Sequence, residues 1–507
     1  MARCEGEISV CRRLPVGAEV QPRGGVHLRV WAPRRNVIEL VLGNEPPTPG
    51  FVLQREQRGY FAGFSSAAVV GTRYGFRLDE DPKLYPDPAS RWQPDGPHEL
   101  SAVVDPAIYC WHDALWQGVA LKGQVLYELH IGTFTSEGTW NAAARELPRL
   151  AELGVTLIEV MPVAEFAGEF GWGYDGVDLF APTRLYGSPD DFRRFVDAAH
   201  GHGLGVILDV VYNHFGPTGN YTGQFSSDYL SRRHHTAWGD AINFDGDDSG
   251  PVREFFITNA GYWIDEYHID GLRLDAVDAI EDDSSDHLLA AVARRVRDAA
   301  GGRRTLVFAE NERQEAKLLR RPEQGGYGLD AGWNDDFHHV ARVAMTGHNE
   351  GYFGDYQGTA QELISAVKWG FLYQGQWSRR QRRAKGTPAL DLDAPQFVVC
   401  LQNHDQVGNA PQGQRCHRLT SPGRHRALTA LMLLAPGTPL LFQGQEFSAS
   451  APFHFFADHE DDLRALVCQG RQESLREFRW LAGSDAAGHF ADPCDRATFE
   501  ASKLDPS

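Results

Sequence analysis

The sequence is poor in cysteine, has no long uninterrupted apolar run and carries fewer positive than negative charges. Its longest apolar stretch, residues 427–442, is interrupted by Pro436, Gly437 and Pro439, which excludes a helix that crosses a bilayer. The 49 Lys and Arg against 68 Asp and Glu give a formal net charge of −19. That balance argues against a nucleic-acid partner, because phosphate binding needs clustered cations.

The seven cysteines are odd in number, and no two of them have CxxC spacing. This pattern indicates reduced thiols rather than a disulfide framework. The first residues, Met1–Glu7, contain no apolar segment of the kind that directs secretion. We therefore expect a soluble, cytoplasmic protein without a membrane partner, and the sequence indicates no particular oligomeric state.

The N-terminal part, residues 1–110, has the pattern of a small β-domain. Residues 27–33, 37–42 and 73–78 alternate polar and apolar side chains, and Gly, Pro and Asn lie between them. Short alternating strands with such turns are typical of an antiparallel β-sandwich. We expect this domain to be followed by a second one, residues 111–507.

In residues 111–507 the pattern changes to strand, loop and amphipathic helix in alternation. Helical patterns cover residues 141–153, 188–202, 251–267 and 286–300. The predicted strands are residues 125–131, 156–162, 205–212, 271–275, 305–310, 332–337, 396–401 and 438–443. Eight strands that alternate with helices predict an α/β fold, a (β/α)8 TIM barrel, rather than an open sheet.

Three of the predicted strands end at or just before an acidic residue, namely Asp275, Glu310 and Asp405. In a (β/α)8 barrel the carboxyl ends of the strands converge on the face that carries the chemistry. Arg273 lies two positions before Asp275 and so shares its side of the strand. A guanidinium there should lower the pKa of Asp275 and keep the acid ionised. A purely structural Arg–Asp pair is the alternative interpretation.

Glu310 follows Asp275 by 35 residues, about one βα unit. An acid in a partly apolar setting can keep its proton and then donate it. An ionised Asp with a proton-donating Glu is the pair that cleaves glycosidic bonds with retention, with carboxyl groups about 5–5.5 Å apart. Asp405, preceded by His404, can hold sugar hydroxyls. Tyr174 offers an aromatic face for a sugar ring, although a single aromatic residue more often belongs to a core.

Four segments of the sequence, in this order, resemble the signature segments of the α-amylase superfamily of glycoside hydrolases. They are Asp209–His214, Gly271–Asp275, Ala309–Asn311 and Asn403–Asp405. The resemblance implies that Asp275 is the nucleophile, Glu310 the general acid/base and Asp405 the third carboxylate. It also implies that Asp209 supports Arg273 from behind. The residues that would contact the sugar are Tyr174, His214, Arg273 and His404.

Within this superfamily the sequence is most similar to the maltooligosyltrehalose trehalohydrolase family. The similarity rests on residues 332–339, 351–356, 401–409 and 444–447. It implies hydrolysis of the α-1,4-glucosidic bond next to a terminal trehalose unit, which releases trehalose without a cofactor. It also implies that the N-terminal sandwich is starch-binding-like. Glycogen-branching or debranching enzymes are the second candidate, and a non-catalytic glucan-binding barrel is the third.

The trehalose end of such a substrate needs contacts of its own. The candidates are Asp335, Asp336, His338 and His339. A metal at these residues is disfavoured, because adjacent side chains on a strand point in opposite directions, and none is expected at the acidic residues 281–286. The basic run at residues 379–385 is interpreted as a solvated loop, because it is isolated in an acidic chain.

Two features depart from these families. Asp278 and Ala279 stand where amylases often have a Lys-His pair, which argues against a plain amylase. The chain also stops at Ser507, where the family continues, so we expect a barrel without its last helix and without a C-terminal β-domain. The helical pattern at residues 460–481 is the candidate to cover the first and last strands. Without that cover, exposed apolar area should limit solubility, stability and activity.

Overall fold

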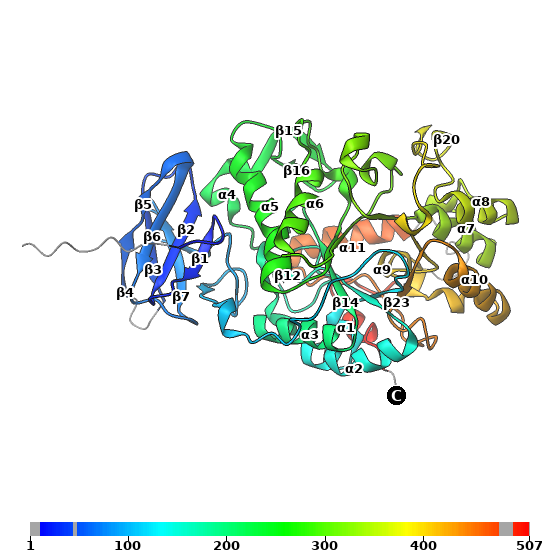
Figure 1. Cartoon of the computed structure of the whole chain (residues 1–507), viewed down its shortest axis with the longest axis horizontal. Coiled ribbons are helices and arrows are strands. Elements are labelled where there is room, and N and C mark those ends of the chain that lie inside the picture. Colours follow the sequence, from blue (N-terminus) through cyan, green and yellow to red (C-terminus); the bar gives the residue numbers. More distant parts are fainter. Residues whose placement is uncertain (1–10, 44–47, 476–489, 506–507) are drawn as a thin grey trace, which may run out of the picture.

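The computed structural model describes residues 11–43, 48–475 and 490–505. Figure 1 shows two parts side by side, an N-terminal pair of β-sheets and a larger barrel surrounded by helices. One sheet contains β1 (Gly17–Val20), β2 (Val26–Trp31), β6 (Tyr60–Ser65) and β5 (Gln54–Arg55), in that order. The other contains β4 (Thr48–Val52), β3 (Ile38–Leu42), β7 (Arg73–Leu78) and β8 (Leu84–Tyr85), with β9 (Ser101–Ala102) also paired to β7.

The two N-terminal sheets share an apolar core. Leu28 on β2 and Ile38 and Phe76 on β3 and β7 are fully buried in one cluster, whereas Glu39, between two buried residues, is partly exposed. This alternation places one face of each sheet inside, and the strands pair in antiparallel fashion. The predicted antiparallel sandwich is therefore confirmed.

Residues 126–442 contain a closed parallel barrel of eight strands. In barrel order these are β10 (Leu126–Leu129), β11 (Leu157–Val160), β14 (Gly205–Val210), β17 (Gly271–Leu274), β18 (Leu306–Ala309), β19 (Ala331–Trp333), β22 (Phe397–Cys400) and β23 (Thr438–Phe442). The last strand pairs with the first, Leu440 lying opposite Leu126. Each strand falls within or at the edge of a predicted range, so the predicted (β/α)8 barrel is confirmed. Residue 110, the predicted end of the N-terminal domain, lies in the connection between β9 of the sandwich and β10 of the barrel.

The helices that follow the early strands also lie where the sequence predicts them. They are α2 (Trp140–Leu153), α3 (Pro189–Gly201), α5 (Ser249–Glu266) and α6 (Leu288–Ala299). Helix α3 begins with a capping box, in which the side chain of Ser188 accepts from the backbone N–H of Asp191 and Asp191 accepts from that of Ser188. Gly154 ends α2 with φ at +96°, a conformation that glycine adopts without strain.

The chain after β19 differs from the prediction of a strand over residues 332–337. The strand ends at Trp333, and α7 (Asp335–Thr346) begins two residues later. Asn334 caps this helix by accepting a hydrogen bond from the N–H of Phe337, and two acidic residues occupy its first turn, where they stabilise the positive end of the helix dipole. His338 and His339 therefore lie on a helix, and the strand-based argument about their directions was wrong.

In the part of the chain after β23 that the structure describes, two further helices follow, namely α11 (Asp461–Leu475) and α12 (Arg496–Ala501). The helix predicted over residues 460–481 is present as far as Leu475, and residues 476–481 lie outside the described residues. Phe499 on α12 stacks on Phe170 at 5.4 Å. The N–H of Leu504 donates to the carbonyl of Thr133, just after β10. By contrast, Leu434 at the end of α10 (Pro422–Leu434) is 85% exposed.

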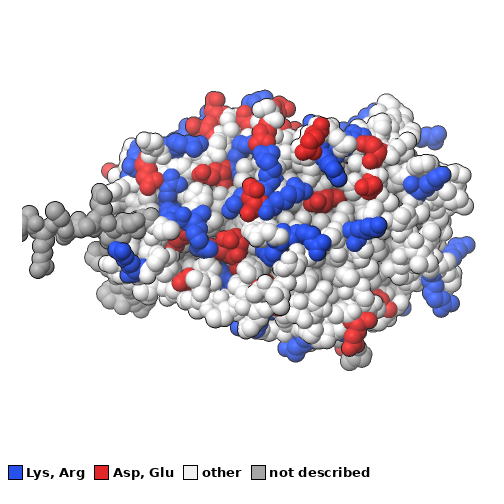
Figure 2. Space-filling view, viewed as in Figure 1, with Lys and Arg blue, Asp and Glu red and all other residues white. Residues whose placement is uncertain are grey.

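The sandwich contacts the barrel through specific side chains. Arg34 binds both carboxylate oxygens of Asp228 at 3.0 and 2.6 Å, and the rings of Trp31 and Tyr229 meet edge to face at 5.2 Å. On the face shown in Figure 2, Lys and Arg are interspersed with Asp and Glu. Among the described residues, no helix has the length and apolar character needed to cross a membrane.

Candidate active site

The carboxyl ends of three barrel strands bring the predicted acids to one cavity. Asp275 follows β17, Glu310 follows β18, and Asp405 lies in the short helix α9 (His404–Gly408) after β22. All three line a cavity of about 670 Å³. The cavity is also lined by Tyr174, His214 and His404. The structure thus brings together residues that are up to 231 positions apart in the sequence.

Arg273 lies at the centre of this arrangement and is fully buried. Its Nη1 donates to Asp209 Oδ2 at 2.6 Å and to Asp275 Oδ1 at 2.8 Å. Its Nη2 lies 2.9 Å from Glu310 Oε2. One planar guanidinium therefore holds the two candidate catalytic carboxylates beside each other. The separation of about 5–5.5 Å between their oxygens stays a prediction.

The surroundings of Asp275 act on its pKa in opposite directions. Burial raises the pKa above its usual value, while Arg273 and the side-chain amide of Asn213 lower it. Asn213 Nδ2 donates to Asp275 Oδ2 at 2.9 Å. Arg273 lowers the pKa of Asp275 as the sequence predicts, but the net shift is upward because burial has the larger effect. Desolvation of the carboxylate is the larger effect here, although both hydrogen bonds favour its ionised form.

Glu310 has the environment of a proton donor. Burial raises its pKa to about 7, and the carboxylates of Asp275 and Asp405 add to the rise against the opposing effect of Arg273. Its Oε2 accepts from the N–H of Ala276 at 2.8 Å. Ala276 has φ at +39°, which is strained for a residue with a Cβ. This turn directly after Asp275 aims the amide at Glu310.

His404 connects the third carboxylate to the barrel wall. Burial alone would lower its pKa, but Asp405 and Glu128 outweigh that effect and raise the pKa to about 9. Its Nδ1 bonds Glu128 Oε1, and its Nε2 lies 3.4 Å from Asp405 Oδ2. His404 is therefore a cation at neutral pH, placed beside the acid that faces the cavity.

Tyr174 continues this chain of hydrogen bonds toward Arg273. Protonated His404 Nε2 donates to the Tyr174 hydroxyl at 2.8 Å, and that hydroxyl donates to Asp209 Oδ2 at 2.7 Å. The ring of Tyr174 stacks on His404 at 5.2 Å. Asp209 thus accepts from both Tyr174 and Arg273, in agreement with the supporting position expected for it.

His214 lines the same cavity. Its Nε2 is 3.1 Å from the carbonyl oxygen of Tyr174, and burial lowers its pKa, so the ring is neutral. The indole of Trp238 stacks on His214 at 5.1 Å and is 54% exposed. Trp238 was not identified from the sequence, because it follows none of the predicted barrel strands. It lies in the turn of the hairpin formed by β15 (Leu230–Thr236) and β16 (Gly239–Ile242).

Glu128 was also missed, although the sequence contains a sign of it. It is a charged residue inside the apolar strand β10, and it is 1% exposed. Charged residues are rarely buried without a partner, so an acid in the middle of a predicted barrel strand should have been considered with the site. Glu159 on β11 has the same placement, and burial together with Glu128 raises its pKa well above the usual value.

The four residues proposed for the trehalose end are not at the cavity lining. Asp336 accepts from the Tyr356 hydroxyl at 2.5 Å and from the N–H groups of Leu372 and Tyr373 at 2.6 and 3.0 Å. It is fully buried, so its oxygens are engaged within the protein. This arrangement corrects the expectation that Asp336 contacts substrate.

His338 and His339 on α7 are buried as well. Burial lowers the pKa of His338 to about 3 and that of His339 well below its usual value, so both rings are neutral. Asp335 is less buried, and burial and the nearby Glu310 raise its pKa to about 8. Of the four candidates, Asp335 is therefore the one whose pKa is raised by a catalytic residue, Glu310. A contact between Asp335 and the substrate stays a prediction.

Comparison with known proteins agrees with this geometry. The model of the alpha-amylase catalytic domain matches residues 120–241. A malto-oligosyltrehalose trehalohydrolase of Deinococcus radiodurans is 43% identical over 97% of this chain and 79% of that protein. One of Saccharolobus solfataricus is 40% identical over 95% of this chain and 82% of that protein. A crystal structure from Salmonella typhimurium, assigned as an alpha amylase, has a TM-score of 0.89 and 42% identity over 98% of this chain and 82% of that one.

These similarities extend over both the sandwich and the barrel. The two relatives carry the same name, and they are 40–43% identical to this chain over nearly its whole length. An amylase-type barrel with a buried arginine between two carboxylates is the site of a glycoside hydrolase. The chain belongs to the malto-oligosyltrehalose trehalohydrolase family.

Proposed function

We propose that this chain cleaves the α-1,4-glucosidic bond next to the terminal trehalose of malto-oligosyltrehalose, with retention, and so contributes to trehalose biosynthesis. The observation that carries the proposal is that Arg273 contacts both acids, Asp275 through Nη1 and Glu310 through Nη2. Both acids line one cavity, as a double displacement requires. The relatives named as malto-oligosyltrehalose trehalohydrolases support this substrate, and the carboxylates at the cavity support this chemistry.

In the first step Glu310 donates its proton to the glycosidic oxygen while Asp275 attacks the anomeric carbon. The bond from that carbon to oxygen breaks, trehalose leaves with the proton, and a glucosyl ester forms on Asp275. A pKa of about 7 for Glu310 keeps a large part of it protonated near neutral pH. A general acid works best when its pKa lies near the working pH.

In the second step the ionised Glu310 takes a proton from water. The water oxygen attacks the anomeric carbon, the ester bond to Asp275 breaks, and the shortened maltooligosaccharide leaves with its original configuration. Both residues return to their starting protonation states. Arg273 stabilises the carboxylate that is ionised at each stage, because it contacts both.

The sugar to be cleaved would be held by the polar groups around these two acids. Asp405 and protonated His404 can bind hydroxyl groups, and the face of Tyr174 is available to the ring. A carboxylate beside the developing oxocarbenium ion stabilises its positive charge. We therefore assign Asp405 to charge stabilisation and His404, His214 and Tyr174 to sugar binding.

The test is chromatography of the products that the purified chain forms from malto-oligosyltrehalose, with maltopentaose as the control substrate. Free trehalose from the first and little hydrolysis of the second are expected. Branched glucan, or linear glucan without trehalose, would overturn the proposal in favour of a branching or debranching enzyme. Binding of substrate without any product would instead indicate a glucan-binding barrel.

The Asp275→Asn variant separates catalysis from binding in the same assay. It keeps the size of the side chain but cannot form the glucosyl ester, so kcat should fall by several orders of magnitude while the substrate still binds. An unchanged kcat would remove Asp275 from the mechanism.

The six described cysteines have free thiols, which supports the cytoplasmic location that we propose for the enzyme.

A further inference from the structure

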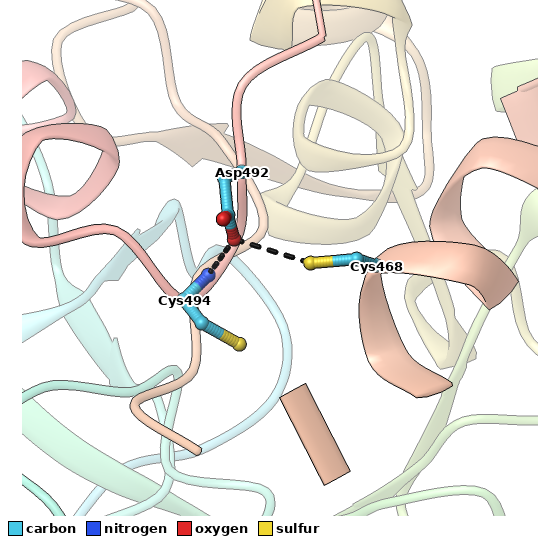
Figure 3. Close-up of side chains that lie close together, drawn as sticks. All are labelled: Cys468, Asp492 and Cys494. Carbon is cyan, nitrogen blue, oxygen red and sulfur yellow. Dashed lines mark hydrogen bonds between the residues drawn. The ribbon is translucent and has the colours of Figure 1, made fainter. Parts of the chain in front are cut away.

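Outside the active site, two cysteines and an aspartate from different segments meet in space. Cys468 lies on α11, and Asp492 and Cys494 lie just before α12. Figure 3 shows the thiol of Cys468 pointing from its helix toward the carboxylate of Asp492, with Cys494 on the other side of that carboxylate. The two sulfur atoms and a carboxylate oxygen lie within 4.8 Å of one another.

The contacts around Asp492 aim one of its oxygens at the thiols. Its Oδ1 accepts from Cys468 Sγ at 3.2 Å and from the N–H of Cys494 at 2.8 Å. Its Oδ2 is bound by Arg464 Nη2 at 2.6 Å. Hydrogen bonds of this kind to a carboxylate fix the orientation of a metal ligand. Arg464 and the N–H of Cys494 therefore hold the Asp492 carboxylate in position.

The spacing of these atoms suits a small tetrahedral cation. Zinc binds thiolate sulfur at about 2.3 Å and carboxylate oxygen at about 2.0–2.2 Å, so neighbouring ligand atoms lie roughly 3.6–3.8 Å apart. The 3.2 Å between Cys468 Sγ and Asp492 Oδ1 is slightly shorter than this. The other two pairs of ligand atoms lie within 4.8 Å of each other, so zinc would be accommodated by side-chain movements of at most about 1 Å.

We propose that Cys468, Asp492 and Cys494 form a binding site for Zn²⁺, with a water molecule as the fourth ligand. Sulfur donors select zinc over magnesium and calcium, which prefer oxygen alone. Cys468 is partly exposed, which leaves room for the water and a path by which the ion enters. The site is structural and takes no part in the hydrolysis proposed above.

Proton and charge balance agree with this assignment. Without the ion Cys468 is a thiol that donates its hydrogen to Asp492 Oδ1, and Cys494 is a buried free thiol. Binding breaks two S–H bonds, forms two Zn–S bonds and releases two protons to solvent. Two thiolates, one carboxylate, the divalent ion and the Arg464 guanidinium then carry no net charge together.

The ion would fasten a helix that reaches the catalytic cavity. Arg471, three residues after Cys468 on α11, donates to the carbonyl of Gly408 at 2.7 Å and to the side chain of Asn409, and it lines the cavity. Gly408 and Asn409 are close neighbours of Asp405 in the chain. A cross-link from α11 to the segment before α12 would therefore hold Arg471 in place.

The test uses the full chain, first stripped of metal with a chelator under reducing conditions. Zn²⁺ is titrated into the protein in the presence of a chromophoric chelator that competes for the ion. The amount of bound metal per chain is measured by inductively coupled plasma mass spectrometry. We expect about one tightly bound ion per chain. Cys468→Ser and Cys494→Ser should each weaken binding at least about 100-fold, since each removes a sulfur ligand. Cys110→Ser, which changes an exposed cysteine elsewhere, should bind as the wild type does.

Co²⁺ provides a second readout that does not depend on stability or activity. Tetrahedral cobalt with two thiolates has intense visible bands and a sulfur-to-metal charge-transfer band, and all of these should be lost in Cys468→Ser. Circular dichroism of each variant shows that it is folded. Absence of stoichiometric binding to the wild type, or binding by both serine variants as tight as that of the wild type, would overturn the proposal. A Cys468–Cys494 disulfide in the protein as purified, seen as a loss of two hydrogens in its mass, would also overturn it.

Discussion

Arg273 Nη2 lies 2.9 Å from Glu310 Oε2, while the same guanidinium is fully buried and donates to Asp275 through its other nitrogen. The nucleophile and the acid are thus positioned by one rigid group from the strand that carries the nucleophile. A planar fork can hold two carboxylates at a fixed spacing, which a single ammonium cannot. Catalysis should therefore be sensitive even to a substitution of Arg273 that keeps the positive charge.

The Arg273→Lys variant should therefore lose most of its activity. We expect kcat on malto-oligosyltrehalose to fall by roughly 10²–10³-fold, the usual effect of removing one preorganised charge contact. Steady-state kinetics measure this. Arg320→Lys is the matched control, because Arg320 forms an ion pair with Asp391 at the surface. A kcat within a factor of about two of the wild type for Arg273→Lys would show that the fork is not needed.

The pH dependence of hydrolysis should follow Glu310. Because its pKa is raised to about 7 and its protonated form donates to the leaving group, kcat should fall as the pH rises through about 7. The Glu310→Gln variant should lose roughly 10²–10⁴-fold in kcat and also lose this alkaline limb. The kcat of Glu310→Gln for an aryl glucoside should fall far less, because the leaving group of that substrate needs no proton. An alkaline limb that persists in Glu310→Gln would assign it to another group.

The stability of the enzyme should depend on pH through His404. Its pKa is higher in the folded state, at about 9, than the ordinary value of 6.5. The resulting stabilisation is fully present below pH 6.5 and is lost as the pH rises through about 9. Glu128→Gln removes one of the charges that raise this pKa, so the fall in the free energy of unfolding over that range should become smaller. Urea unfolding at a series of pH values measures it, and an equal fall in both proteins would contradict the interpretation.

Asp336→Asn should separate structure from substrate binding. The variant weakens the charged hydrogen bonds to Leu372 N and Tyr373 N, and we expect the free energy of unfolding to decrease by about 2 kcal/mol. The kcat/KM should stay close to that of the wild type, because Asp336 does not line the cavity. Asp335→Asn is the paired variant, and it should change kcat/KM if Asp335 contacts substrate. A stable Asp336→Asn enzyme with a raised KM would restore the original expectation for Asp336.

The barrel was predictable because its strands are buried on both sides and therefore appear as short apolar runs. Acids directly after such runs, as at Asp275 and Glu310, were visible for the same reason. The helix that begins at Asp335 was missed, although an asparagine followed by two aspartates is a helix-start pattern. Periodicity over six residues could not distinguish that start from the end of a strand.

Other features depend on contacts that no local pattern contains. Glu128 and His404 are 276 positions apart and meet only when the barrel is formed. The net pKa of Asp275 depends on how far burial outweighs Arg273, and burial is a property of the assembled site. The meeting of Cys468 with Asp492 and Cys494 likewise requires the fold of α11 against the chain that precedes α12.

Glu128 comes from the first strand of the ring and His404 from just after the seventh, and the eighth lies between those strands. The rise in the pKa of His404 that comes from Glu128 therefore requires that this junction has formed, whereas the contribution of Asp405 does not. A nascent or partly unfolded chain that has formed the middle strands would already carry Asp275, Arg273 and Glu310 side by side, yet His404 would lack its hydrogen bond to Glu128. The charge state of a residue that lines the cavity thus depends in part on the junction between the first and last strands of the barrel.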